Sequence, residues 1–190
     1  MCGGKSSRMG KDKSLLNYHG KAQCYHVYEI LQHFCNETFI SCNPSQTAFI
    51  DKKYKTIEDL TKYNDAGPVT GVLTAFSHFP QQPILVIGCD YPFLSETEIS
   101  HFLLNISAGA MASAFYDDQN QCYQPVLAWY SAAAAPLILD MFQKKQRSLQ
   151  QFLKMANAEK YYPLNRASMM SVDAREASEE AVRLIANNNH

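Results

Sequence analysis

The chain has 190 residues, of which 46% are hydrophobic and 18% charged. This length fits a single domain, and this composition can build a sizeable core and excludes a disordered chain. Its 17 basic and 18 acidic side chains leave a net charge of −1, which argues against a broad nucleic-acid-binding surface.

The pattern of apolar residues argues against a membrane protein. The longest strongly apolar runs, 83–87 and 132–139, are too short to span a bilayer. The first residues do not resemble a signal peptide, because residues 3–13 are polar and glycine-rich. We therefore expect a cytoplasmic protein. The six cysteines are scattered without a Cys-x-x-Cys pair, which favours buried free thiols over disulfides or a zinc site.

In the first half of the chain, predicted helices alternate with short strands. Residues 21–34 carry apolar side chains at helical spacing and predict an amphipathic helix. The β-prone runs 38–42 and 54–57 predict strands, which end at Asn43-Pro44 and at Glu58-Asp59. Residues 67–79 again have helical spacing, with Gly67-Pro68 at the helix start.

The second half continues this alternation. Residues 83–89 are apolar throughout and predict a strand covered on both faces of a parallel sheet. In the helix predicted over 95–106, Ser95 and Glu98 have the spacing of a capping box. Strands are predicted over 111–116, 125–130 and 169–172, and helices over 132–144, 149–155 and 176–186. The expected fold is a doubly wound, mostly parallel α/β sheet in one domain, 1–190.

The segment 3–13 has the composition of a phosphate-binding loop. Gly3 and Gly4 let backbone N–H groups approach phosphate oxygens, and Ser6 and Ser7 add hydroxyl donors. Arg8 offers a planar fork for a polyphosphate and Lys13 a compact charge. It is not a Walker A loop. Composition alone favours the alternative, a solvated Gly/Ser/Lys loop.

Asp90 directly follows the most apolar strand. It should therefore lie at the carboxyl end of the sheet, where α/β enzymes bind ligands. A carboxylate beside a phosphate loop is a natural Mg²⁺ ligand. The alternative is an aspartate that makes a turn before Pro92.

Three further polar residues follow predicted strands. Asn43 and Asp59 end strands on the same edge of the sheet and could reach a bound base or ribose, although capping or turn roles would explain either one. Asp173 lies between the last predicted strand and helix. It is either a helix cap or a second metal carboxylate.

Together these segments resemble the molybdenum cofactor guanylyltransferases of the nucleotidyltransferase superfamily. That family has an L-A-G-G-x-x-x-R-M-G-x-x-K loop, and residues 3–13 match it from the two glycines onward. Its G-P-x-x-G motif corresponds to residues 67–71, and its C-D-x-P-F motif to residues 89–93. The order and separations fit over nearly the whole chain.

The resemblance implies a Rossmann-like fold of the nucleotide-diphospho-sugar transferase type and an Mg²⁺-dependent reaction. The enzyme would transfer GMP from GTP to the phosphate of molybdopterin, with or without bound molybdenum, and release pyrophosphate. Its partners would be GTP, molybdopterin and molybdenum-enzyme maturation proteins. The matched positions also imply a role for each residue. Gly3, Gly4, Arg8 and Lys13 would hold the triphosphate, and Asn43 and Asp59 would contact the guanosine. Asp90 and Asp173 would bind the metal ion, and the catalytic residues would be Arg8, Lys13 and Asp90.

This sequence departs from the family pattern in two places. The family has an apolar strand before the glycine loop, whereas the given sequence has only Met1-Cys2 before Gly3, so that strand is expected to be absent from it and its two neighbours exposed. Either the sequence begins inside a longer gene product, or the fold compensates for the missing strand. The family's late N-x-N-T-P-E segment corresponds to residues 171–176, with Asp173 as the cation ligand. Rival hypotheses are a related nucleotidyltransferase that uses CTP or a sugar phosphate, and a nucleotide-binding homologue without activity.

Overall fold

The computed structural model describes Met1, Cys2, residues 15–64 and residues 66–172. Its main elements are α1 (Gln23–Leu31), β1 (Ile40–Cys42), α2 (Pro44–Thr47), β2 (Thr56–Glu58), α3 (Pro68–His78), β3 (Ile84–Ile87), α4 (Glu96–Leu104), β4 (Ala112–Asp117), β5 (Cys122–Tyr130), α5 (Ala134–Gln143), α6 (Leu149–Met155) and β6 (Glu159–Tyr161). Two 3₁₀ turns complete the list, η2 (Thr61–Tyr63) and η3 (Arg166–Met169).

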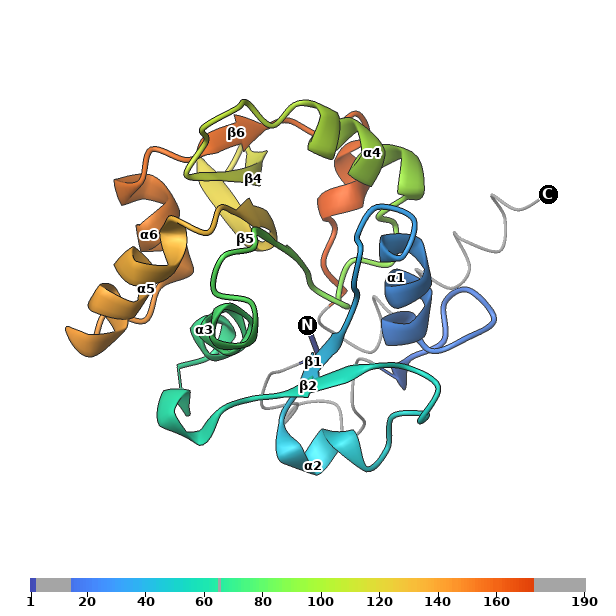
Figure 1. The fold of residues 1–190 in the computed structure, drawn as a ribbon. Coiled ribbons are helices and arrows are strands. Elements are labelled where there is room, and N and C mark those ends of the chain that lie inside the picture. Colours follow the sequence, from blue (N-terminus) through green and yellow to red (C-terminus); the bar gives the residue numbers. More distant parts are fainter. Residues whose placement is uncertain (3–14, 65, 173–190) are drawn as a thin grey trace.

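The described strands form two sheets (Figure 1). β1 and β2 pair in parallel, while the larger sheet has the order β3-β5-β4-β6. In the larger sheet β4 and β6 are parallel, and β5 runs antiparallel to both β3 and β4. The predicted α/β class is confirmed, and β5 is the strand that departs from the parallel direction.

Helices cover both faces of the larger sheet. On one face, α3, α5 and α6 bury a cluster that includes Val72, Tyr130 and Leu153. On the other face, α1 and α4 bury a second cluster, which includes Phe102 and Phe115. Because successive strand residues point to opposite faces, β3, β4 and β5 each contribute to both clusters. This is the doubly wound arrangement that the alternating sequence pattern predicted.

Met1 and Cys2 connect the two sheets. The ammonium group of Met1 donates to Ile87 O at 2.6 Å, and the amide of Cys89 donates to Met1 O at 3.3 Å. This is the parallel-ladder pattern, with Met1 opposite Gly88. The amide of Cys2 donates to Ser41 O at 2.9 Å on the β1 side. These two residues therefore occupy the carboxyl end of a strand position between β1 and β3.

This placement gathers three thiols at the junction. Cys2, Cys42 and Cys89 belong to one buried cluster, and the cysteines in the described segments are free. A hydrogen bond with Cys2, together with burial, raises the pKa of Cys89 well above its ordinary value. Thiols of this kind are unreactive packing groups, in agreement with the prediction from the sequence.

Several predicted elements need correction. β3 has an antiparallel neighbour, and Ile84 and Leu85 are only half-buried, so it is not a strand enclosed by parallel neighbours. The strand predicted over 169–172 is wrong: residues 166–169 form a 3₁₀ turn, and the last described strand is β6. The predicted helix over 176–186 lies outside the described residues. No described helix is long and apolar enough to cross a membrane.

Candidate functional site

Three of the residues predicted for the site lie along one edge of the structure. Asn43 follows β1, Asp59 follows β2, and Asp90 comes shortly after β3. The Met1 ladder makes β1, β2 and β3 parallel, so their carboxyl ends meet at a common edge. Met1 and Cys2 lie between Asn43 and Asp90 at this edge. The structure thus brings these three predicted residues to the place where α/β folds bind ligands.

Asn43 is the N-cap of α2. Its Oδ1 accepts hydrogen bonds from the Gln46 amide at 3.1 Å and from the Ser45 hydroxyl at 2.6 Å. The Gln46 side chain caps in return, accepting from the Asn43 amide, and also donates to Cys2 O at 3.0 Å. Asn43 therefore has the capping role that was its alternative, and Gln46 ties this cap to the chain entering residues 3–14.

Asp59 lies in a drier environment. Its amide donates to Cys42 O at 2.9 Å, which fixes it beside the end of β1. Burial raises the pKa of Asp59, and the charge of the Met1 ammonium partly opposes this rise. Within the described chain its Oδ1 is buried without a hydrogen-bond partner. Such an oxygen would gain most from a donor on a bound ligand.

Asp90 is held from two directions. The Ser171 hydroxyl donates to its Oδ2 at 3.1 Å, and the Val172 amide donates to its backbone oxygen at 2.9 Å. A Cβ atom at Gly88 would lie 2.5 Å from Asp90 Oδ1 and 3.1 Å from Val126. Glycine is therefore needed at position 88 for the carboxylate to hold this position. The side chain remains half-exposed at the sheet edge.

The two glycines of the Gly67–Gly71 motif are needed for different physical reasons. Gly67 is the N-cap of α3, with φ +57° and ψ −136°, a conformation that essentially only glycine adopts. At Gly71 a Cβ atom would lie 2.6 Å from Met1 Cε and 2.9 Å from Ser41 Oγ. The second glycine therefore lets α3 pack closely against the junction formed by Met1 and β1.

The remaining predicted site residues lie outside the described chain. They are Gly3, Gly4, Arg8, Lys13 and Asp173. Among the residues that are described, no group of three or more His, Cys, Asp or Glu side chains could hold a metal ion. The described part of the site thus offers two separate carboxylates, Asp59 after β2 and Asp90 after β3.

Two contacts at this edge were missed in the sequence. Gln46 could have been found, because Asn43-x-x-Gln46 has the spacing of a capping box. Ser171 had no usable signal, since its contact with Asp90 spans 81 positions in the chain. Long-range contacts of this kind depend on how the chain returns to the sheet edge.

Several solved structures have a similar fold. The molybdopterin-guanine dinucleotide biosynthesis protein A of Archaeoglobus fulgidus superposes with a TM-score of 0.80 at 22% identity, over 98% of this chain and 96% of that one. The 2-C-methyl-D-erythritol 4-phosphate cytidylyltransferase of Thermus thermophilus has a TM-score of 0.68 at 13% identity, over 92% and 94% of the two chains. This chain therefore shares the fold of these two proteins.

The family follows from the sequence match. Residues 1–161 match the MobA-like NTP transferase domain, and the chain belongs to this family. A molybdenum cofactor biosynthesis bifunctional protein of Synechocystis is 31% identical over 77% of this chain, which spans 41% of that relative's length. A molybdenum cofactor guanylyltransferase of Pseudomonas entomophila is 26% identical, over 80% of this chain and 79% of that protein.

Proposed function

We propose that this protein transfers GMP from GTP to the phosphate of molybdopterin, with or without bound molybdenum. The phosphate oxygen would attack the α-phosphorus of GTP, the bond between the α-phosphorus and the bridging oxygen would break, and pyrophosphate would leave. The observation that carries the proposal is the position of Asp90, in a chain of the MobA-like family, at the carboxyl edge beside Asn43 and Asp59. The guanylyltransferase names of several relatives support GTP as the donor.

Mg²⁺ is the proposed cofactor, and the described residues fit it. Mg²⁺ is usually held by one or two carboxylates together with substrate phosphates and water. Asp90 offers a half-exposed carboxylate that Ser171 orients. A single carboxylate suits an ion whose other ligands are phosphate oxygens and water, and the described residues contain no larger cluster of metal ligands. When bound, the ion would neutralise charge on the polyphosphate. Asp173 is proposed as a second carboxylate.

The chain's own groups would bind and orient the nucleotide. The backbone of Gly3 and Gly4, with Arg8 and Lys13, is proposed to hold the triphosphate, and Arg8 and Lys13 to stabilise charge on the departing pyrophosphate. Asn43 and Asp59 are proposed to face the guanosine. The unpartnered Asp59 oxygen supports such a contact, because guanine and ribose both present hydrogen-bond donors.

The nucleotide preference can be tested by thermal shift. GTP with Mg²⁺ should raise the unfolding temperature more than CTP, ATP or UTP, since a ligand that binds only the folded state stabilises it according to its affinity. At a nucleotide concentration 100 times the dissociation constant, the gain is about 2.7 kcal/mol. Equal shifts for all four nucleotides, or the largest shift with CTP, would overturn the guanylyl assignment.

The role of Asp90 requires a separate variant. Asp90→Asn keeps the shape of the side chain and an oxygen for Ser171, but it removes the charge that binds Mg²⁺. We expect turnover to fall by at least 100-fold, because metal charge stabilisation contributes several kcal/mol to such reactions. Ser171→Ala should lower turnover much less, because it removes a hydroxyl that only orients the carboxylate. Near-normal turnover of Asp90→Asn at limiting Mg²⁺ would show that Asp90 does not bind the ion and only forms a turn.

A further inference from the structure

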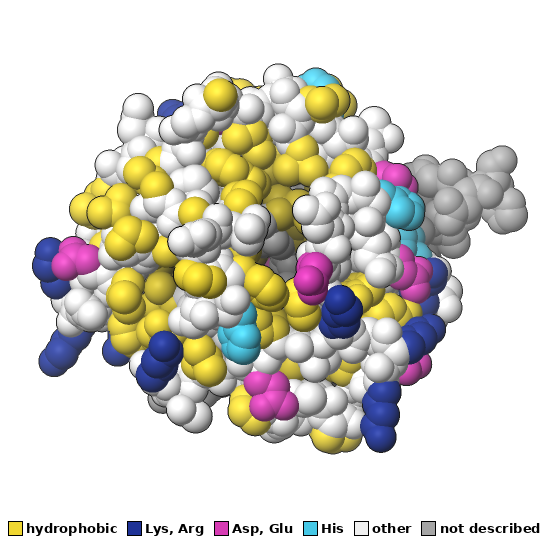
Figure 2. All heavy atoms as spheres, viewed as in Figure 1, with side chains coloured by type: hydrophobic (Ala, Val, Ile, Leu, Met, Phe, Trp, Pro, Cys, Tyr) yellow, Lys and Arg dark blue, Asp and Glu magenta, His cyan; other side chains and the backbone are white. Residues whose placement is uncertain are grey.

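Helix α3 carries two buried hydroxyl groups. On the face drawn in Figure 2, charged side chains lie scattered among hydrophobic ones at the surface. Thr70 and Thr74 of α3 are instead buried, and they lie one helical turn apart on the same side of the helix. Their neighbours Val69, Val72 and Leu73 belong to the apolar core cluster. A hydroxyl group in such surroundings costs stability unless it is hydrogen-bonded.

Both hydroxyl groups bond to the backbone of the segment that follows β2. The Thr74 hydroxyl accepts from the Leu60 amide at 3.0 Å. The Thr70 hydroxyl donates to Tyr63 O at 2.6 Å and accepts from the Ala66 amide at 3.3 Å. We call this segment, residues 59–64, 66 and 67, the β2–α3 loop. Its beginning is therefore tied to α3 by Thr74 and its end by Thr70.

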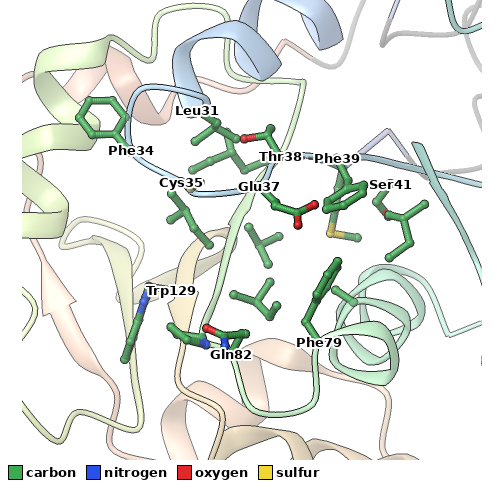
Figure 3. Close-up of a pocket in the computed structure, with 18 of the residues that line it drawn as sticks. Leu31, Phe34, Cys35, Glu37, Thr38, Phe39, Ser41, Phe79, Gln82 and Trp129 are labelled. Carbon is green, nitrogen blue, oxygen red and sulfur yellow. Dashed lines mark hydrogen bonds between the residues drawn. The ribbon is translucent and has the colours of Figure 1, made fainter. Parts of the chain in front are cut away.

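Another side of α3 packs against β1 and the residue before it. Phe79, directly after the helix, packs on Phe39, with the two ring centroids 5.2 Å apart (Figure 3). A Cβ atom at Gly71 would lie 2.9 Å from Ser41 Oγ, so the helix approaches β1 closely. These contacts fix α3 relative to β1. The helix is therefore a firm support for the β2–α3 loop.

The Thr74 hydrogen bond lies one residue from Asp59. The Asp59 amide donates to Cys42 O at 2.9 Å, and the next amide, that of Leu60, donates to Thr74. Two consecutive amides thus fix the backbone of Asp59 between β1 and α3. The Asp59 Oδ1 is buried and has no hydrogen-bond partner within the described chain. Because the backbone is held on both sides, this oxygen has its place before a ligand arrives.

We propose that Thr74 is a positioning residue, which sets the nucleotide selectivity of the site by holding the Asp59 carboxylate in place. This inference rests on the proposed function, in which Asp59 faces the guanosine. Guanine offers two adjacent donors, N1–H and the 2-amino group, and the ribose offers its hydroxyl groups. A site built to bond such donors rejects a nucleotide that lacks them, because its own buried polar group then stays unpaired. A displaced carboxylate loses this discrimination.

The test compares Thr74→Val with Thr74→Ser. Valine keeps the shape of threonine but cannot accept from the Leu60 amide, whereas serine keeps the hydroxyl. Each protein is titrated by calorimetry with GTP, CTP, ITP and 2′-deoxy-GTP in the presence of Mg²⁺. Thr74→Val should lower the preference for GTP over CTP roughly tenfold, as for one lost buried hydrogen bond, and Thr74→Ser should restore most of it. A matching loss against ITP assigns the contact to the 2-amino group, and against 2′-deoxy-GTP to the ribose.

A double variant separates positioning from a purely structural role. When Asp59→Asn is already present, Thr74→Val should cause no further loss of GTP binding, because the carboxylate that Thr74 positions has been removed. The loss of stability caused by Thr74→Val, measured by urea unfolding, should be the same with and without Asp59→Asn. Tyr63→Phe is the matched control. It removes a hydroxyl that bonds to Ser77 Oγ at 3.1 Å, in the same loop, and should leave the selectivity unchanged.

Two results would overturn this inference and leave the proposed function intact. One is a Thr74→Val protein that prefers GTP as strongly as the unchanged chain does, and the other is an equal loss of GTP binding with and without Asp59→Asn. An unchanged chain that binds GTP no better than CTP would overturn both. If Thr74→Val does not fold, NMR hydrogen exchange of the unchanged chain decides. Exchange of the Leu60 amide should slow more with GTP than with tripolyphosphate, which has no base or ribose, and equal slowing contradicts the inference.

Discussion

Ionisable side chains in this molecule differ mainly in the water and the charges around them. Asp90 is half-exposed and receives a hydroxyl donor from Ser171, which suits a group that exchanges ligands. Asp59 has a buried oxygen and a raised pKa, so binding a donor there would favour its ionised form. Glu98 is 2% exposed and satisfied by protein donors, which gives it a structural role. The surroundings of these carboxylates therefore distinguish their roles more clearly than their positions in the sequence do.

His26 gives a prediction for the pH dependence of stability. Burial, with the charges of His19 and Lys21, lowers the pKa of His26 from 6.5 to about 4. Between these values the unfolded chain binds the proton more readily, so the free energy of unfolding should fall as the pH drops from about 6.5 to about 4. Above pH 6.5 this contribution is fully present. Urea unfolding at pH 7.5, 6 and 5 measures it.

Replacement of His26 supplies the control for this effect. His26→Gln should flatten the dependence in that window, while His78→Gln, at an exposed position of α3, should leave it as it was. A His26→Gln protein whose stability falls with pH as steeply as that of the unchanged chain would mean that other groups cause the loss.

At the scale of elements, α4 shows how a local motif can be redirected by the fold. The Ser95 hydroxyl caps the helix by accepting from the Glu98 amide at 3.1 Å, as the sequence predicted. The Glu98 carboxylate does not complete the capping box. It accepts instead from the Tyr161 hydroxyl at 2.7 Å and from the Leu164 amide at 2.9 Å. Further donors come from Asn165 and Ser168, so α4 anchors the chain after β6.

The two halves of this motif should therefore act independently. Ser95→Ala should destabilise the protein by about 1 kcal/mol through loss of the cap. Glu98→Gln should cost roughly 1–3 kcal/mol, because some buried donors then face an amide NH₂. The double variant should be additive to within about 0.5 kcal/mol. Glu98→Gln combined with Tyr161→Phe should instead show strong coupling. Urea unfolding of all the variants measures the free energies of unfolding from which the additivity and the coupling are calculated. If Glu98 is coupled to Ser95 and not to Tyr161, the Glu98 side chain acts in the capping box after all.

How far the sequence predicted these elements depends on the range of the interactions that fix them. Helical periodicity located α1, α3 and α6, because the spacing of apolar residues along the sequence defines their buried faces. β6 was missed, because its three residues are specified by pairing with β4 rather than by local pattern. Asp90, Asn43 and Asp59 could be placed at one edge, since each follows the end of a predicted strand. The contact of Asp90 with Ser171 and the influence of the Met1 charge on Asp59 arise from tertiary packing and could not be predicted.

In the whole molecule, the fold brings the candidate site to the carboxyl edge that β1, β2 and β3 share, beside Met1 and Cys2. Helices on both faces hold β3 and β5 in place, and β1 and β2 form the other side of the junction (Figure 1). Because Met1 and Cys2 lead directly into Gly3 and Gly4, whatever fixes the junction should also affect nucleotide binding.

The central claim is that the protein joins GMP to a pterin phosphate. The decisive measurement is incubation of the protein with GTP, Mg²⁺ and molybdopterin, followed by mass spectrometry of the products and detection of pyrophosphate. We expect molybdopterin guanine dinucleotide and pyrophosphate in equal amounts, with at least 100-fold less product from CTP or from the Asp90→Asn variant. GTP that binds but yields no dinucleotide, or CTP that yields as much product as GTP, would contradict it.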